Sequence, residues 1–264
     1  MTDSLHLRES EISHYCRMKS YPDGVEIIAA NRPVFREPGF ELSDKWGSKK
    51  SEVKREKPSV PVDTDRARRR AASAVRDLVL CNDFRYFVTL TLDKEKIERY
   101  EISEIVKHLR VWLDNAVRRQ GLKYVLVPEY HKDKAIHFHG FFNDALPVIP
   151  AGVTDGHGHP VFNLPSWTYG FTTAIEIYGD YQKATAYICK YVRKSSEKIG
   201  GRWYFHGGKL NKPDISYPDL TLTELLDSGE NVYQFSVPEG RLSFGIIRRE
   251  GGVFDGVQKL PGVD

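Results

Sequence analysis

Apolar residues recur with two different periods along the chain, and these periods predict both strands and helices. Four segments rich in β-branched and aromatic residues are predicted to be strands: 84–92, 124–130, 135–142 and 171–178. Three segments repeat apolar residues at helical spacing: 65–80, 102–120 and 180–194. Strands and helices in this order predict an α+β fold with a central antiparallel sheet flanked by helices.

The predicted elements divide the chain into three parts. Residues 61–210 carry most of the strands and helices and are expected to form one domain. Residues 1–60 are predicted to be an N-terminal extension that is partly flexible, because residues 39–58 are polar and charged. Residues 211–264 are predicted to be an acidic appendage whose segments 232–235 and 242–247 form a β-hairpin. Within the domain, the segment 143–170 is rich in Pro and Gly and is expected to be an irregular insertion.

Composition places the chain among globular proteins. It has 264 residues, 40% of them hydrophobic, which is enough for one sizeable core. Its three cysteines are widely spaced, which favours a reducing compartment over a disulfide framework. The N-terminal residues lack the apolar stretch of a signal peptide, and no run reaches transmembrane length. We therefore expect a soluble, cytoplasmic protein without a membrane partner.

Charge is unevenly distributed along the sequence. The net charge is only +3, yet residues 49–76 carry ten basic and four acidic residues, whereas residues 213–240 carry six acidic and no basic ones. A charged run is by default a solvated face. The arginines in the first segment also suit phosphate binding, and three of them are candidate DNA-binding residues: Arg66, Arg69 and Arg70.

Two predicted strands carry a set of side chains suited to a metal ion. The polar segment 131–134 predicts a hairpin between strands 124–130 and 135–142. Successive strand residues point to opposite faces, so His137 and His139 share one face and Phe138 takes the other. The hairpin brings Glu129 alongside the histidines. Two imidazoles and a carboxylate suit Mg²⁺ or Mn²⁺, and Zn²⁺ also fits. The alternative is that both histidines simply face solvent.

The last predicted helix carries a face of alternating tyrosines and lysines. Tyr187, Lys190, Tyr191 and Lys194 follow the spacing i, i+3, i+4 and i+7. Tyrosine hydroxyls can attack a phosphate, and lysines can stabilise the negative charge that develops there. Tyrosines on an amphipathic helix can instead be packing residues.

A second His-x-His pair lies in the predicted irregular segment. His157 and His159 are flanked and separated by glycines, so no strand is expected to hold them rigidly. We expect this pair to have no ligand role.

Three motifs in order resemble those of a known family. The segments 87–93, 137–139 and 187–194 are similar to motifs I, II and III of the HUH endonucleases. The resemblance extends over roughly residues 84–210. The most similar group is the two-tyrosine rolling-circle replication initiators of small single-stranded-DNA phages and related plasmids.

The resemblance implies a fold, an activity and partners. It implies a nuclease fold related to the ferredoxin-like folds, and a metal-dependent enzyme that nicks and rejoins one DNA strand through a 5′-phosphotyrosine. Glu129, His137 and His139 would hold Mg²⁺ or Mn²⁺, and Tyr187, Tyr191 and Lys190 would be catalytic. Arg193 and Lys194 would contact DNA. The partners would be single-stranded or supercoiled origin DNA and the helicase and polymerase of a bacterial host, in whose cytoplasm the protein would act.

Two other functions stay open at this point. A transposase or a conjugative relaxase would use the same chemistry in another biological setting. A non-catalytic module that binds single-stranded nucleic acid would stack bases on strand aromatics, whereas the sheet face predicted here offers histidines and Glu129. Metal-dependent cleavage distinguishes this module from the enzymes.

Overall fold

The computed structural model describes residues 13–36, 62–131, 133–178, 181–236 and 242–250. The chain divides into two compact units, residues 59–212 and a second unit made of the segments before and after them. Both units combine antiparallel sheet with helix, which confirms the predicted α+β class. Within the described ranges, every helix is too short or too polar to cross a membrane.

A seven-stranded antiparallel sheet forms the frame of unit 59–212. Its strands are β5 (Tyr86–Thr91), β6 (Tyr124–Tyr130), β7 (Ile136–Phe142), β8 (Ile149–Thr154), β9 (Pro160–Asn163), β10 (Thr172–Glu176) and β11 (Phe205–Gly207). They lie in the order β11-β6-β7-β5-β10-β9-β8. The four predicted strands are therefore present, and β5 is the middle strand, with β7 beside it and β6 beside β7.

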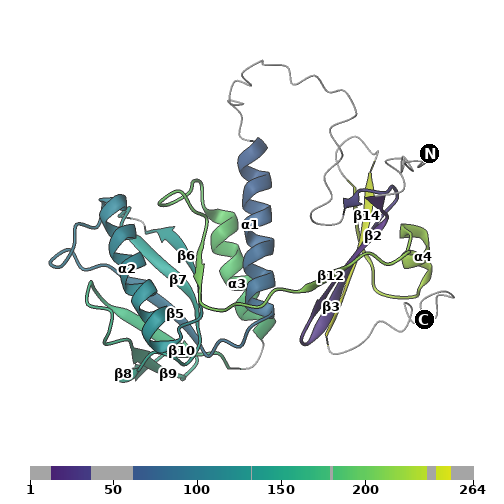
Figure 1. The fold of residues 1–264 in the computed structure, drawn as a ribbon. Coiled ribbons are helices and arrows are strands. Elements are labelled where there is room, and N and C mark those ends of the chain that lie inside the picture. Colours follow the sequence, from purple (N-terminus) through teal and green to yellow (C-terminus); the bar gives the residue numbers. More distant parts are fainter. Residues whose placement is uncertain (1–12, 37–61, 132, 179–180, 237–241, 251–264) are drawn as a thin grey trace, which may run out of the picture. The chain divides into compact units, whose positions relative to one another are not determined.

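Three helices cover the two faces of this sheet (Figure 1). Helix α2 (Ile102–Gln120) packs on one face through residues at helical spacing, among them Ile105, Leu109 and Leu113. It ends at Gly121, whose φ of 73° is left-handed, a conformation that glycine adopts without steric cost. Helices α1 (Val62–Leu80) and α3 (Tyr181–Lys194) lie side by side on the other face. Residues 179 and 180, at the start of the predicted helix 180–194, lie outside the described residues.

The alternation of β7 separates its packing residues from its histidines. Phe138 is fully buried and belongs to the cluster beneath α2. Phe141, three residues on, packs instead with α1 and α3. His137 and His139 share the face of Phe141, since residues two apart in a strand point the same way. The sheet thus presents both histidines to the side that carries α3.

The prediction that segment 143–170 is irregular is wrong, because this segment contains β8 and β9. These strands pair with each other, and β9 also pairs with β10, so they extend the sheet. The turn between them is closed by Asp155, whose Oδ1 accepts hydrogen bonds from the backbone N–H groups of His157 and His159. Pro150 lies in the edge strand β8, where a missing N–H is tolerated.

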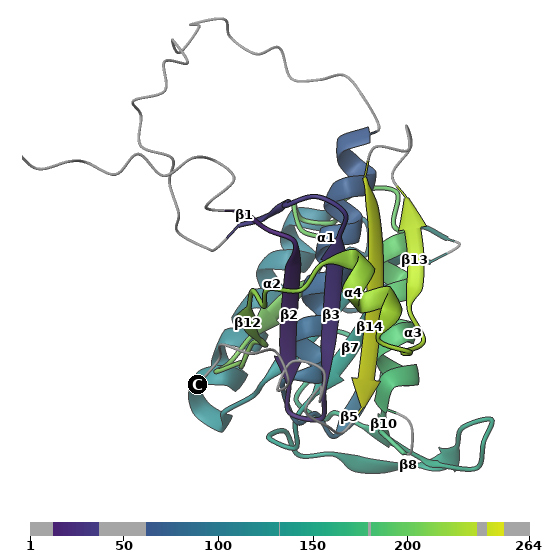
Figure 2. The same ribbon diagram turned by 90° about the vertical axis from the view of Figure 1, so that its right-hand side faces the viewer.

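The second unit joins both ends of the chain in one sheet. Its elements are β1 (Ser13–His14), β2 (Cys16–Tyr21), β3 (Gly24–Ala30), β4 (Phe35–Arg36), β12 (Asp214–Ser216), α4 (Leu222–Asp227), β13 (Tyr233–Ser236) and β14 (Ser243–Glu250). Five of the strands follow the order β12-β2-β3-β14-β13, as Figure 2 shows. The described residues of the predicted extension 1–60 and of the predicted appendage 211–264 therefore share one sheet, in which seven residue pairs join β14 to β3.

One acidic residue of the segment 213–240 has a structural role at the start of helix α4. Thr221 and Glu224 form a capping box at its N-terminus, in which each side chain accepts a hydrogen bond from the backbone of the other residue. Leu222 and Leu225 pack on β3 and β14 with Ile27 and Ile247. The predicted flexible stretch 39–58 and the basic residues at 49–57 lie outside the described residues.

Candidate active site

The register of the β6–β7 hairpin brings the predicted metal ligands together. Glu129 pairs directly with His137, and on the other side of β7 Thr91 and Thr89 pair with His137 and His139. Side chains of directly opposed residues on one face start roughly 5 Å apart. One patch of the sheet therefore holds a carboxylate and two imidazoles.

His139 is held at both ring nitrogens. Its Nε2 lies 3.2 Å from Oε2 of Glu129, and its Nδ1 lies 3.1 Å from the hydroxyl of Thr89. Only 12% of its side chain is exposed. Burial, with the nearby His137, lowers the pKa of His139 to about 4. The imidazole is thus neutral at pH 7, so its contact with Glu129 is polar and not an ion pair, and neutral imidazole is the form that binds metals.

His137 is turned toward a residue of the hairpin turn. Its ring stacks on His131 with centroids 4.8 Å apart and an interplanar angle of 6°. Its centroid lies 6.2 Å from that of His139. Burial and His131 lower the pKa of His137. Across the described residues, no three His, Cys, Asp or Glu side chains converge as a ready metal site.

The donor set nevertheless fits a divalent ion in chemical type, since a carboxylate and two imidazoles share one face of the sheet. Glu129 and His139 already touch, and His137 lies directly opposite Glu129 in the register. Burial raises the pKa of Glu129, while Lys194 and His131 oppose this rise. Thr89 holds the second nitrogen of His139, a role that outer-sphere groups take at metal sites.

Helix α3 places both predicted tyrosines beside these histidines. The ring of Tyr191 stacks on His139, with centroids 4.5 Å apart and an interplanar angle of 8°. The hydroxyls of Tyr187 and Tyr191 lie 2.5 Å apart. Tyr187 is 48% exposed, and its ring lies 5.7 Å from that of Phe87 on β5. Burial and the hydrogen bond shared with Tyr187 raise the pKa of Tyr191. The apolar side of the helix, with Ile188 and Val192, is buried.

A small cleft opens next to Tyr191. It has a volume of about 190 Å³ and is lined by Glu129, Tyr130, Tyr191, Lys194, Ser195, Ser196, Glu197 and Ile199. Of the basic residues that the sequence predicts to contact DNA or phosphate, Lys194 lies in this cleft. Lys190 and Arg193 are exposed on the same helix. The cleft combines two carboxylates, two phenols and one ammonium group, and Lys194 is its only cation among the lining residues.

The arginines of α1 fall into two groups. Arg66, Arg69 and Arg70 are exposed and available to a polyanion. Arg68 is half-buried and donates a hydrogen bond of 2.8 Å to the carbonyl of Ser195, just past the end of α3, and it also pairs with Asp65. A cation at this place satisfies carbonyls that a helix C-terminus leaves without partners. Arg68 therefore has a structural role.

The second His-x-His pair belongs to the β8–β9 turn. His159 stacks on Tyr178 at 4.4 Å, and its Nδ1 lies 3.2 Å from Asp155. Both histidines close the turn through their backbone N–H groups. The side chain of His159 therefore has a structural role in this turn.

Three contributors to the site carry no distinctive sequence signal. His131 lies in the hairpin turn and stacks on His137, although its spacing resembles no ligand motif. Tyr130 and Glu197 border the cleft from segments that are far apart in sequence. Only the folded hairpin and the chain beyond α3 bring them together.

Comparison with known families gives one match. Residues 85–196 match a family of replication-associated proteins, described under the name ORF2. This match supports a replication initiator of the Rep type. It runs from just before β5 to just beyond α3, so it includes Glu129, both histidines of β7 and both tyrosines of α3. Searches of curated proteins and of solved structures gave no significant match.

Proposed function

We propose that unit 59–212 is an HUH-type endonuclease and strand transferase that starts rolling-circle replication by nicking one DNA strand at an origin. The observation that carries this proposal is the stacking of Tyr191 on His139, with the Tyr187 hydroxyl 2.5 Å from that of Tyr191. Two nucleophiles thus lie over a patch of imidazoles and carboxylate. The family match over residues 85–196 supports the role in replication.

The nicking step is a transesterification. The Tyr187 oxygen forms a bond to the scissile phosphorus, and the bond from phosphorus to the 3′ oxygen breaks. The proton of the exposed Tyr187 phenol passes to solvent water, and the departing 3′ oxygen takes up a proton from solvent. The products are a free 3′-hydroxyl, which can prime synthesis, and a 5′-phosphotyrosine. One phosphodiester is exchanged for another, so no nucleotide cofactor is consumed.

Tyr187 is assigned the first attack because it is the more accessible of the two tyrosines. It is 48% exposed, whereas Tyr191 is half-buried against His139. Tyr191 would attack a second phosphodiester when the strand is transferred and the circle is closed. Since the hydroxyls are neighbours, the strand needs only a small shift between the two reactions.

Basic side chains of α3 balance the charge of the phosphate. Lys194 lies in the cleft with Glu129 and Tyr191 and can stabilise the additional negative charge of the transition state. Lys190 is one turn earlier on the same helix and can contact the adjoining phosphate. The exposed arginines Arg66, Arg69 and Arg70 would guide the strand.

Glu129, His137 and His139 would hold a divalent ion, Mg²⁺ or Mn²⁺. When bound, such an ion supplies Lewis acidity to a phosphate oxygen. Thr89 orients His139 toward this task, and His137 would exchange its stacking on His131 for a place beside Glu129.

The test is formation of a covalent protein–DNA adduct. The protein is incubated with Mn²⁺ and labelled single-stranded DNA from the region that flanks its own coding sequence, and adducts are detected on a denaturing gel. We expect an adduct that resists boiling in detergent and disappears with a chelator. Binding without cleavage under all ionic conditions would instead identify a non-catalytic single-strand-binding module.

A further inference from the structure

A second cleft of about 460 Å³ lies next to the nicking site, within the roughly 300–1,000 Å³ of ligand pockets. Its lining comes from four separate segments of unit 59–212: Tyr100, Ile102, Tyr130, Lys134, Ile136 and Glu197. Tyr130 and Glu197 also line the small cleft beside Tyr191. The two clefts therefore border each other, so the base next to a phosphate held at the first lies within reach of the second.

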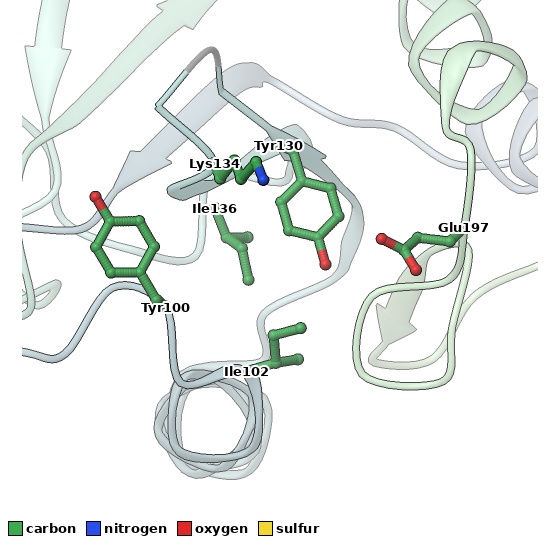
Figure 3. A pocket seen from close by; sticks show the side chains of 6 residues that line it. All are labelled: Tyr100, Ile102, Tyr130, Lys134, Ile136 and Glu197. Carbon is green, nitrogen blue, oxygen red and sulfur yellow. The ribbon is translucent and has the colours of Figure 1, made fainter.

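The side chains in this cleft have the character of a base-binding site. Tyr100 and Tyr130 stand on opposite sides, with Ile102 and Ile136 between them, as Figure 3 shows. Tyr100 is 56% exposed although it is a large aromatic residue. Unstacked bases bind to proteins by stacking on aromatic rings and by packing on apolar side chains. The rings and isoleucines offer such a surface.

Two charged groups mark the rim and the far side of the cleft. Lys134 reaches over the cleft beside Tyr130, while the carboxylate of Glu197 lies across from the Tyr130 hydroxyl (Figure 3). Lys134 has a φ of 66°, a left-handed conformation that is uncommon outside glycine, and its N–H donates to the carbonyl of His131. Such conformations occur more often at functional sites. The lysine can meet a phosphate, and the carboxylate can accept a hydrogen bond from a base.

We propose that this cleft binds one unstacked nucleobase of the DNA strand close to the scissile phosphate and selects a base that carries an exocyclic amino group. This inference rests on the proposed nicking function and adds its sequence specificity. The base stacks on Tyr100 and packs on the isoleucines. Glu197 accepts a hydrogen bond from the amino group, as acidic side chains do from cytosine N4. Thymine has no amino group and is disfavoured.

The test measures DNA binding separately from the formation of the covalent adduct. The full chain carrying Tyr187→Phe and Tyr191→Phe is the binding background, since it keeps both rings and lacks both nucleophiles. Each cleft substitution is added to this background and equilibrated with a randomised pool of single-stranded 30-mers, a length chosen for about ten nucleotides on either side of the site. Affinity and base frequencies at each aligned position are measured by sequencing bound DNA. The same substitutions in the wild-type chain report adduct formation.

Tyr100→Ala is expected to weaken binding on the order of tenfold, whereas Tyr100→Phe keeps the stacking ring and the affinity. The matched control is Tyr178→Ala, because Tyr178 is a 46%-exposed tyrosine of the same unit whose ring stacks on His159. Glu197→Gln is expected to raise the frequency of thymine at one aligned position, because an amide can donate as well as accept a hydrogen bond.

The outcomes distinguish this inference from the function on which it rests. Adducts from the wild-type chain, with Tyr100→Ala binding as tightly as Tyr178→Ala, would overturn the base site and leave the nickase standing. An unchanged base profile for Glu197→Gln would overturn the selection by the amino group. Absence of both adduct and binding in the wild-type chain would overturn the function and the base site together.

Discussion

His139 links the sheet, the carboxylate and the tyrosine helix through one side chain. It contacts Thr89 on β5, Glu129 on β6 and Tyr191 on α3. These contacts arise because β7 lies between β6 and β5 and because α3 lies on the face of β7 opposite Phe138. The geometry of nicking therefore depends on how this ring is held.

Replacement of the histidines tests the proposed ligand set. His137→Ala and His139→Ala are each expected to lower the rate of adduct formation on the order of a hundredfold or more, because each removes a donor for the ion. His157→Ala is the matched control from the second His-x-His pair, and it should retain the wild-type rate. The rate is measured by quantifying adduct over time at fixed Mn²⁺.

Thermal unfolding of each variant is measured as well, because His139 is mostly buried and its replacement can destabilise the fold. A folded His139→Ala protein that nicks at the wild-type rate would remove His139 from the site. An inactive His157→Ala with active His137→Ala would reverse the assignment of the two pairs.

At the residue level, the strand period predicted the shared face of His137 and His139, and the hairpin turn predicted the proximity of Glu129. Other contacts could not be predicted. The stacking of His131 on His137 depends on the conformation of the turn, and the hydrogen bond from Arg68 to Ser195 joins residues 127 positions apart. Counting charges along the sequence does not distinguish Arg68 from the neighbouring arginines. Only the folded structure shows that Arg68 is half-buried while its neighbours are exposed.

The β6–β7 pair is the element on which the ligand geometry depends, and Gly140 is required for its close pairing. A Cβ at this position would lie 1.9 Å from the carbonyl oxygen of Val125 on β6. Gly140→Ala must push the strands apart and is expected to lower the free energy of unfolding by about 2 kcal/mol. Denaturant titration measures this change. Unaltered stability would show that the strands adjust without cost.

The second prediction at the level of elements concerns the two groups of arginines on helix α1. Replacement of Arg66, Arg69 and Arg70 by Ala should reduce the slope of log affinity against log salt by about 2 if each contacts one phosphate of single-stranded DNA. Binding is measured by fluorescence anisotropy over a salt series. An unchanged slope would mean that these side chains are only solvated.

Arg68→Ala is the contrasting variant on the same helix. It is expected to leave the salt slope unchanged and to lower stability by roughly 1 kcal/mol, because it removes a cation from the C-terminus of α3. A changed slope with normal stability would make Arg68 a DNA contact.

At the level of elements, long amphipathic segments were predicted well and glycine-rich ones poorly. Helix α2 agrees with the predicted segment 102–120, because its apolar period is regular over five turns. Strands β8 and β9 were missed, since β8 lies at a sheet edge and its residues are mainly exposed, with no alternation of apolar side chains.

At the level of the whole molecule, each unit has its own buried clusters. The two clusters of unit 59–212 draw their residues from that unit, and the third cluster draws on β2, β3, α4 and β14. The pairing of β14 with β3 could not be predicted, because it joins residues more than two hundred positions apart without a connecting motif.

A deletion distinguishes the roles of the two units. Removal of residues 213–264 eliminates four elements of the second unit and exposes Ile27 and Cys16, which pack in its cluster. We expect loss of protease resistance in the remaining N-terminal segment, with adduct formation kept within about threefold. Limited proteolysis and the adduct assay measure the two effects. Complete loss of nicking by a folded unit 59–212 would assign the second unit a part in catalysis.

The central claim is that Tyr187 and Tyr191 form the covalent bond to DNA, and mapping the adduct by mass spectrometry tests it most directly. Trypsin cleaves after Lys183, Lys190 and Arg193, so the two tyrosines fall in different peptides, 184–190 and 191–193. After nuclease trimming, we predict that the first adduct on a single-stranded oligonucleotide lies in peptide 184–190 and is lost in Tyr187→Phe. Tyr191→Phe should still nick but fail to close the circle. Intact nicking with neither peptide modified would contradict the covalent mechanism.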